Sequence, residues 1–317
     1  MNQIALSVVD REASSAFYRE LFGLRNVGGT HFTGKVTEKV QGMPGATSDV
    51  SWHMDDREFF QLELFQFSCP TPRAYAAKRQ PWDIGYSRLA IEVADPVAFH
   101  AKCAQRQVSG LTPIKHLRGR PFFCLNDPNG VLIEVGGISP GSQPLGANTG
   151  ARLVGVALSV PSLDVAVNSF QQTIGCPLLD AAPMDKGSLW GESPAQKRSV
   201  LLDAGTAWLE INEYACPVAM AWPEGYRICD HGLLNVAFGF RSAVEIRDMY
   251  QRMVGGGFRP NTELVSVMGQ TVLTYLNDTQ GFNVELLMVK PVLDGVMGFR
   301  QANSLDRLLM KISMALA

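Results

Sequence analysis

The segment RLAIEV (residues 88–93) alternates in the manner of a half-buried β-strand, and three further segments resemble it. All four have alanine as their third residue: QIALSV (3–8), RLAIEV (88–93), GVALSV (155–160) and NVAFGF (235–240). A helical stretch follows each of them, and later a strand with a glutamate between apolar neighbours: QLELFQF (61–67), VLIEVGG (131–137), WLEINEY (208–214) and NVELLMV (283–289). The chain therefore contains four copies of a strand–helix–strand–strand–strand unit.

The linker SPGSQPLGANTG (139–150) is rich in glycine, serine and proline, and it separates the second copy from the third. We therefore predict two domains, residues 1–140 and 151–290, each made of two consecutive copies. A tail, residues 291–317, lies outside the repeat. Its apolar residues from Ser304 onward recur at helical spacing, which predicts a C-terminal helix.

Composition limits the functional classes. The 317 residues are 46% hydrophobic and 18% charged, with a net charge of −2, so we expect a globular protein that binds neither nucleic acid nor a membrane. No apolar run is long enough for a membrane-spanning helix. The six cysteines form no CxxC pair and the N-terminus shows no leader, so we expect a cytoplasmic protein with reduced thiols, either a monomer or a homodimer.

Two segments share parts of one longer motif, with an aspartate, a glycine and the repeat glutamate in order: IKHLRGRPFFCLNDPNGVLIEV (114–135) and TYLNDTQGFNVELL (274–287). Together with the repeat, they resemble the vicinal oxygen chelate superfamily, which includes glyoxalase I, bleomycin-resistance proteins and type I extradiol dioxygenases. The resemblance covers residues 3–289. It implies an α+β fold in which four βαβββ modules form two tandem glyoxalase-like half-barrel domains, followed by the C-terminal helix.

Members of this family hold a metal with side chains from the first and last strands of each module. The resemblance places the corresponding positions of the first module pair at Gln3, Glu63, Arg88 and Glu134. It places those of the second pair at Gly155, Glu210, Asn235 and Glu285. The dioxygenase iron site needs two histidines, whose positions hold Gly155 and Asn235, so extradiol dioxygenase activity is not expected.

Arg88 departs most from the family pattern. A guanidinium stays protonated and offers no lone pair to a metal, so we expect no tightly bound metal and no other cofactor. A divalent metal, if one binds, would use Gln3, Glu63 and Glu134. Two interpretations of Arg88 remain open: a buried ion pair in a vacated metal site, or a group that stabilises an anion while Glu63 or Glu134 moves a proton.

Further candidate site residues follow from the same family positions. We predict that His116 is the acid–base partner of Arg88, Glu63 and Glu134, while a solvated hairpin explains its basic surroundings equally well. The candidate substrate-binding residues, which the resemblance places in or near a half-barrel, are Gln3, His53, Tyr275, Asn235 and Glu285.

These residues lead to one functional hypothesis and two alternatives. The leading hypothesis is an enzyme that carries out metal-independent proton transfer, of the isomerase or lyase type, on an apolar organic acid or ring-derived metabolite. The first alternative is a non-catalytic protein that binds and sequesters a small molecule, as bleomycin-resistance proteins do. The second is a metal-dependent lyase or dioxygenase with an unusual site made of Gln3, Glu63 and Glu134.

Overall fold

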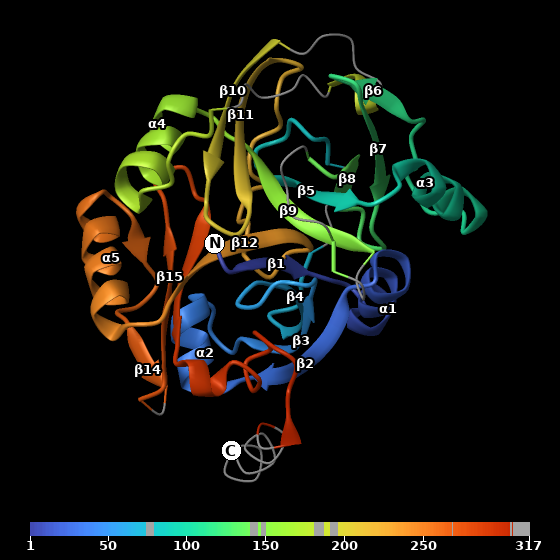
Figure 1. Cartoon of the computed structure of the whole chain (residues 1–317). Helices are drawn as coiled ribbons and strands as arrows, with labels where there is room; N and C mark the ends of the chain where they lie inside the picture. Colours follow the sequence, from blue (N-terminus) through green and yellow to red (C-terminus); the bar gives the residue numbers. More distant parts are fainter. Residues whose placement is uncertain are drawn as a thin grey trace. The chain divides into compact units, whose positions relative to one another are not determined.

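The structure is a computed structural model of the chain (Figure 1). It describes residues 1–73, 79–139, 145–146, 150–180, 187–190, 196–267, 269–304 and 306. None of the helices in this described part is long and apolar enough to cross a membrane. The strands form two mixed sheets, and each sheet belongs to one of two compact units.

Unit 1 comprises Met1–Ser15, Leu24–Arg73 and Ile228–Ala317. The first module supplies β1 (Gln3–Ser7), the start of α1 (Arg11–Phe22), β2 (Arg25–Phe32), α2 (Gly34–Gln41), β3 (Thr47–Met54) and β4 (Gln61–Cys69). The fourth module supplies β12 (Gly232–Phe240), α5 (Ala243–Gly255), β13 (Arg259–Pro260), β14 (Val265–Val267), β15 (Thr271–Asn277) and β16 (Asn283–Val289), and a 3-10 turn follows at Pro291–Leu293. The strand order is β13-β15-β16-β12-β1-β4-β3-β2, with β14 paired to β15.

Unit 2 comprises Ala16–Gly23 and Ala74–Arg227. The second module supplies β5 (Gly85–Val93), α3 (Pro96–Gln105), β6 (Lys115–Leu117), β7 (Arg120–Asn126) and β8 (Leu132–Gly137). The third supplies β9 (Ala151–Ser159), α4 (Leu163–Val167) with a π-helical continuation (Asn168–Ile174), a 3-10 turn (Gly187–Trp190), β10 (Gln196–Asp203) and β11 (Trp208–Cys216). The strand order is β10-β11-β9-β5-β8-β7-β6.

The four βαβββ modules and the α+β class are confirmed, but the modules pair differently from the prediction. β1 is antiparallel to β12, so the first module shares a sheet with the fourth, and β5 is antiparallel to β9, so the second shares a sheet with the third. The predicted domains 1–140 and 151–290 are therefore wrong. The first strands of all four modules share one alternating pattern, so the sequence does not determine which two pair.

Local signals explain where the elements of unit 1 begin and what they cover. Ser242 accepts a hydrogen bond from the backbone N of Val244 and so caps α5, which packs on β12 and β16. α2 packs on β3 and β15, and Val40 of this helix joins a core cluster with Trp52 and Tyr275. Every residue of β1 is buried. A polar side chain on β1 therefore lies in a dry environment and needs a partner.

The chain after β16 also packs on unit 1. Phe299 is fully buried, and its carbonyl accepts a hydrogen bond of 3.0 Å from the backbone N of Phe59. Arg241 forms an ion pair with Asp294 and lies over the Phe59 ring. The predicted C-terminal helix from residue 304 onward lies outside the described residues except for residues 304 and 306.

Candidate functional site

Four polar side chains meet on one face of the sheet of unit 1, each from a different strand: Gln3 on β1, Glu63 on β4, Asn235 on β12 and Glu285 on β16. Ala5 is in register with both Glu63 and Asn235, and Ala237 is in register with both Gln3 and Glu285. Residues in register, or two apart on one strand, share a face of a sheet. We call these four residues the four-oxygen site; all of them are at most 4% exposed.

Hydrogen bonds hold the two carboxylates of the four-oxygen site. Glu63 accepts one bond of 2.8 Å from Trp52 Nε1 and one of 3.3 Å from Gln3 Nε2. Glu285 accepts a bond from the Tyr275 hydroxyl, and Asn235 also bonds to Tyr275. The side chains therefore form two hydrogen-bonded groups, one around Glu63 and one around Glu285, and the charges of the two carboxylates interact.

The two carboxylates are abnormally basic. Burial raises the pKa of Glu63 to about 7, although the bond from Trp52 acts in the opposite direction. Burial, and then the negative charge of Glu63, raise the pKa of Glu285 well above its usual range. Two buried carboxyl groups that repel each other do not both ionise easily. At neutral pH, Glu63 can therefore both take up and release a proton.

The two amides of the four-oxygen site each leave an oxygen without a hydrogen-bond donor: Gln3 Oε1 and Asn235 Oδ1. Both atoms are buried, and an unpaired buried polar atom is costly. Two carboxylates and two free amide oxygens on one face are the kind of ligand set that hard divalent cations take. The described residues contain no cluster of three or more His, Cys, Asp or Glu side chains, so any cation held by protein groups here would depend on the amides.

The matching positions in unit 2 hold a different arrangement, which we call the arginine cluster. Arg88 on β5 is fully buried; its Nε lies 3.0 Å from Oε2 of Glu134 and its Nη2 lies 2.5 Å from Oε1 of Glu210. Lys197 Nζ lies 3.6 Å from the same Glu210 oxygen, and the guanidinium lies 5.3 Å from the centre of the Trp190 ring. Burial opposes the charge of Arg88, but the two carboxylates outweigh it and raise the pKa of Arg88.

The fourth ligand position of unit 2 is filled by a ring. A Cβ atom on Gly155 would come within 2.1 Å of the Trp208 indole, so only glycine fits there. Two cationic side chains and two carboxylates balance in the arginine cluster, so a divalent cation would add uncompensated positive charge. Of the two interpretations of Arg88, the geometry therefore favours a buried ion pair in a former ligand position.

The structure separates the predicted catalytic residues. Arg88 and Glu134 meet in the sheet of unit 2, whereas Gln3 and Glu63 belong to the sheet of unit 1. The predicted catalytic set (Arg88, Glu63 and Glu134) and metal set (Gln3, Glu63 and Glu134) therefore each combine positions from two sheets. His116 is exposed on β6, outside the buried arginine cluster. The expected pairing of consecutive modules is the cause of these errors, since it joined ligand positions from two different sheets.

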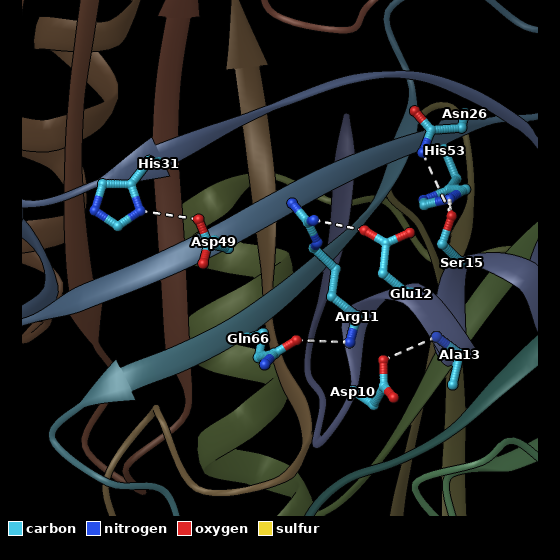
Figure 2. A network of polar contacts seen from close by, with 10 residues as sticks. All are labelled: Asp10, Arg11, Glu12, Ala13, Ser15, Asn26, His31, Asp49, His53 and Gln66. Atoms are coloured by element: carbon cyan, nitrogen blue, oxygen red, sulfur yellow. Dashed lines mark hydrogen bonds and ion pairs between the residues drawn. The ribbon is translucent and has the colours of Figure 1, made fainter.

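Four of the five predicted substrate-binding residues lie in one part of unit 1, and His53 is the exception. Gln3, Asn235, Tyr275 and Glu285 lie together in or beside the four-oxygen site. His53 does not: it follows Trp52 in β3 and so points to the opposite face, where Ser15 lies 2.8 Å from its Nε2 (Figure 2). Figure 2 shows Asn26 completing this network through Ser15.

Sequence reasoning missed two functional partners. Trp52 is not among the predicted site residues, yet its indole donates a hydrogen bond to Glu63, its direct register partner on β4. This register is visible only in the structure. Glu210 was assigned to another half-barrel, yet it pairs with Arg88. Its position in the repeat, equivalent to that of Glu134, was the signal that could have identified it.

Comparisons with known proteins agree with this geometry. Residues 1–135 match the model of the Glyoxalase/Bleomycin resistance protein/Dioxygenase superfamily. Glyoxalase I from Zea mays is similar in structure, with a TM-score of 0.64, 15% identity and coverage of 94% of each chain. A dioxygenase-like protein from Bacillus subtilis has a TM-score of 0.62 and 12% identity, covering 98% of this chain and 94% of its own. No curated protein matches the chain in sequence.

The comparisons therefore confirm the predicted resemblance. The first two modules match the glyoxalase superfamily in sequence, and the four-module chain has the glyoxalase type of fold over nearly its whole length. At 12–15% identity, the structural similarity shows the fold but does not identify the reaction.

The fold family implies a metal at the strand positions of the four-oxygen site, and the residues present fit a divalent cation. Gln3 Oε1 and Asn235 Oδ1 are buried acceptors without donors, and Glu63 and Glu285 bring negative charge that burial alone disfavours. All four candidate donors are oxygens, which favours Mg²⁺ or Mn²⁺ over softer ions.

Proposed function

We propose that unit 1 carries the active site of an enzyme that moves a proton on a small organic substrate, in chemistry of the isomerase or lyase type. One observation supports this most: the four-oxygen site joins two buried, mutually repelling carboxylates to two amide oxygens that lack donors. Such perturbed groups cluster at catalytic sites more often than in structural cores.

Glu63 is the proposed base. With its pKa raised to about 7, it can accept a proton from a carbon or hydroxyl of the substrate and return it within one turnover. Trp52 and Gln3 hold its two oxygens, so the carboxylate keeps one orientation during the transfer. Tyr275 donates a hydrogen bond to Glu285, and its hydroxyl would also bond a substrate oxygen on the same face.

Gln3, Glu63, Asn235 and Glu285 would hold a divalent cation. When bound, it would polarise a substrate oxygen next to the carbon that loses the proton. The expectation of metal-free chemistry depended on the positive charge of Arg88, which lies in the other unit. That argument therefore does not apply to the four-oxygen site.

The surroundings of the four-oxygen site favour a small, largely apolar substrate. Trp52 and Tyr275 belong to a core cluster with Val50, Phe65 and Met43, all of them apolar or aromatic. The hydrogen bonds to the two carboxylates come from an indole, a phenol and an amide, none of which carries positive charge. An anionic substrate would therefore bind only with a cation to offset both carboxylates.

Deuterium exchange offers a test that does not require the natural substrate. We would incubate the protein with a panel of small 2-hydroxy and 2-oxo compounds in D₂O, with Mg²⁺ or Mn²⁺, and follow loss of the C–H signal by NMR. Glu63→Gln should slow any exchange by about 10²-fold or more, whereas the matched variant Glu134→Gln should not. A compound that binds unit 1 but never exchanges or reacts would instead support the sequestering alternative.

A further inference from the structure

Two more buried amides lie beside the four-oxygen site, and neither makes a side-chain hydrogen bond. Asn2 is 2% exposed and Gln61 is 1% exposed. The nitrogen and the oxygen of both side chains are without a partner, in addition to the free oxygens of Gln3 and Asn235. Side-chain amides at this degree of burial are normally paired, so this group of six unpaired atoms calls for an explanation.

The positions of Asn2 and Gln61 place both amides on the face of the four-oxygen site. Gln61 is in register with Gln3 and lies two residues before Glu63 on β4, so all three share a face. Asn2 lies over Gly239, because a Cβ atom added there would approach Asn2 Cγ to 2.4 Å. Gly239 alternates with Ala237, the register partner of Glu285, so Asn2 lies on the same face.

A glycine packs against each of these two amides. Gly239 of β12 lies against Asn2, and Gly298, from the segment after β16, lies against Gln61. A Cβ atom on Gly298 would come within 2.8 Å of both Gln61 Oε1 and Trp52 Cβ. The buried ring of Phe299 holds this segment in place. A side chain at either glycine would collide with the amide groups in their present positions.

The chemistry of these amides selects a class of ligand. Each amide offers both a donor and an acceptor, and none is charged. Asn2 and Gln61 carry no positive charge that would balance a negatively charged group in this buried place. The matching ligand group is therefore neutral and both donates and accepts hydrogen bonds, as a carboxamide or a hydroxyl does. A site built in this way rejects analogues that lack the matching group.

We propose that Asn2 and Gln61 form an amide subsite that binds a neutral carboxamide or hydroxyl group of the substrate next to the four-oxygen site. This rests on the proposed function, because the subsite orients the substrate for proton transfer at Glu63. It narrows the substrate to molecules with an uncharged polar end beside the reactive centre.

Acetamide and acetate provide the test, since they share size and shape and differ in charge and in the ability to donate. Binding of each to the full-length protein is measured by saturation-transfer NMR at pH 7.5, with chelator present. Acetamide should bind, and acetate should give at most a fifth of its signal. Gln61→Met and Asn2→Leu should each reduce the acetamide signal at least fivefold.

Gln66→Met is the matched control. Gln66 lies on the same strand as Gln61 but points to the other face, where its Oε1 accepts a bond from the backbone N of Arg11 (Figure 2). This control should bind acetamide like the natural protein. Thermal unfolding of every variant confirms that it is folded, and Gln61→Met together with Asn2→Leu provides two independent removals of the subsite.

Three other outcomes of the binding experiment would contradict the proposed amide subsite. Acetate binding as well as acetamide, neither of them binding, or unchanged acetamide binding in Gln61→Met and Asn2→Leu would show that the amides do not recognise ligands. The proposed function fails separately: Glu63→Gln would then leave cation binding and deuterium exchange intact. Cation binding without acetamide binding would preserve the proposed function and remove only the subsite.

Discussion

Trp52 Nε1 donates a hydrogen bond of 2.8 Å to Oε1 of Glu63 across neighbouring strands. This bond stabilises the ionised carboxylate and so partly offsets burial, which raises the pKa of Glu63 to about 7 in the presence of the bond. The indole therefore adjusts the basicity of the proposed catalytic base. The relationship ties the local pairing of β3 and β4 directly to the chemistry of the four-oxygen site.

Replacing the donor should move the pH dependence of the reaction. Trp52→Phe removes the hydrogen bond, so the pKa of Glu63 should rise, and the limb of the rate profile that depends on ionised Glu63 should shift upward by about one pH unit. The measurement is the pH–rate profile of deuterium exchange. Trp222→Phe, which alters a ring stacked on Tyr226 in unit 2, serves as control. An unshifted limb in Trp52→Phe would contradict the role of the indole.

The stability of the protein should fall as the pH rises from about 4.5 to about 7 in the absence of divalent cations. The pKa of Glu63 is 4.5 in its unperturbed state and about 7 in the folded chain, so the folded state holds the proton longer. The stabilisation from protonated Glu63 is fully present below its unfolded-state pKa of 4.5 and is lost as the pH rises through its folded-state pKa of about 7. For Glu63 alone the loss is about 3 kcal/mol.

Urea unfolding at pH 5 and pH 7.5, with chelator, measures this loss. Glu63→Gln has no such proton, so its free energy of unfolding should change less between the two pH values by about 2 kcal/mol, since part of the full loss falls below pH 5. If both proteins show the same pH dependence, the carboxylate is not held in its protonated form by the fold.

The arginine cluster should be structural. Arg88→Met leaves Glu134 and Glu210 buried with less positive charge around them, which should cost about 3–5 kcal/mol of stability. Adding Glu134→Gln and Glu210→Gln should recover part of the loss, because the uncompensated charges are gone. Chemical denaturation of the three proteins measures this. Arg88→Met with normal stability would show that the pairs contribute little.

Substitution of Gly298 should destabilise the protein because a side chain there would meet neighbouring atoms, and not only because its φ is positive. Gly298 and Gly269 both have positive φ, 72° and 64°, but only Gly298 has atoms within 4 Å of an added Cβ. Gly298→Ala should therefore destabilise the protein by about 1–3 kcal/mol more than Gly269→Ala. Urea unfolding compares the two. Equal losses would mean that the segment over Trp52 and Gln61 shifts without cost.

The repeat could be predicted from the sequence because the strand periodicity and the position of the glutamate recur in every module. That placed Gln3, Glu63, Asn235 and Glu285 on first and last strands, where the structure has them. Their assembly into one site was not readable, because it depends on β1 pairing with β12 over a separation of more than two hundred residues. Alternation alone fixes which face a side chain takes and not which strand lies beside it.

The same limit explains the error over Arg88. A guanidinium offers no lone pair to a metal, but the sequence does not show which of the four repeat glutamates neutralise Arg88. Glu134 was predicted and found, whereas Glu210 came from the unexpected partner module. His53 and Trp52 show a finer limit: they are adjacent in sequence, and only the register with Glu63 identifies which of them faces the site.

Binding of Mn²⁺ to the full-length protein tests the central claim most directly. Chelator-treated protein is titrated with Mn²⁺ and free Mn²⁺ is followed by electron paramagnetic resonance, at pH 6 and pH 8. The account predicts one bound ion per chain, tighter binding at pH 8 because Glu63 and Glu285 must lose protons, loss of binding in Glu63→Gln and Glu285→Gln, and normal binding in Glu134→Gln. Absence of binding, or binding lost in Glu134→Gln and kept in Glu63→Gln, would contradict it.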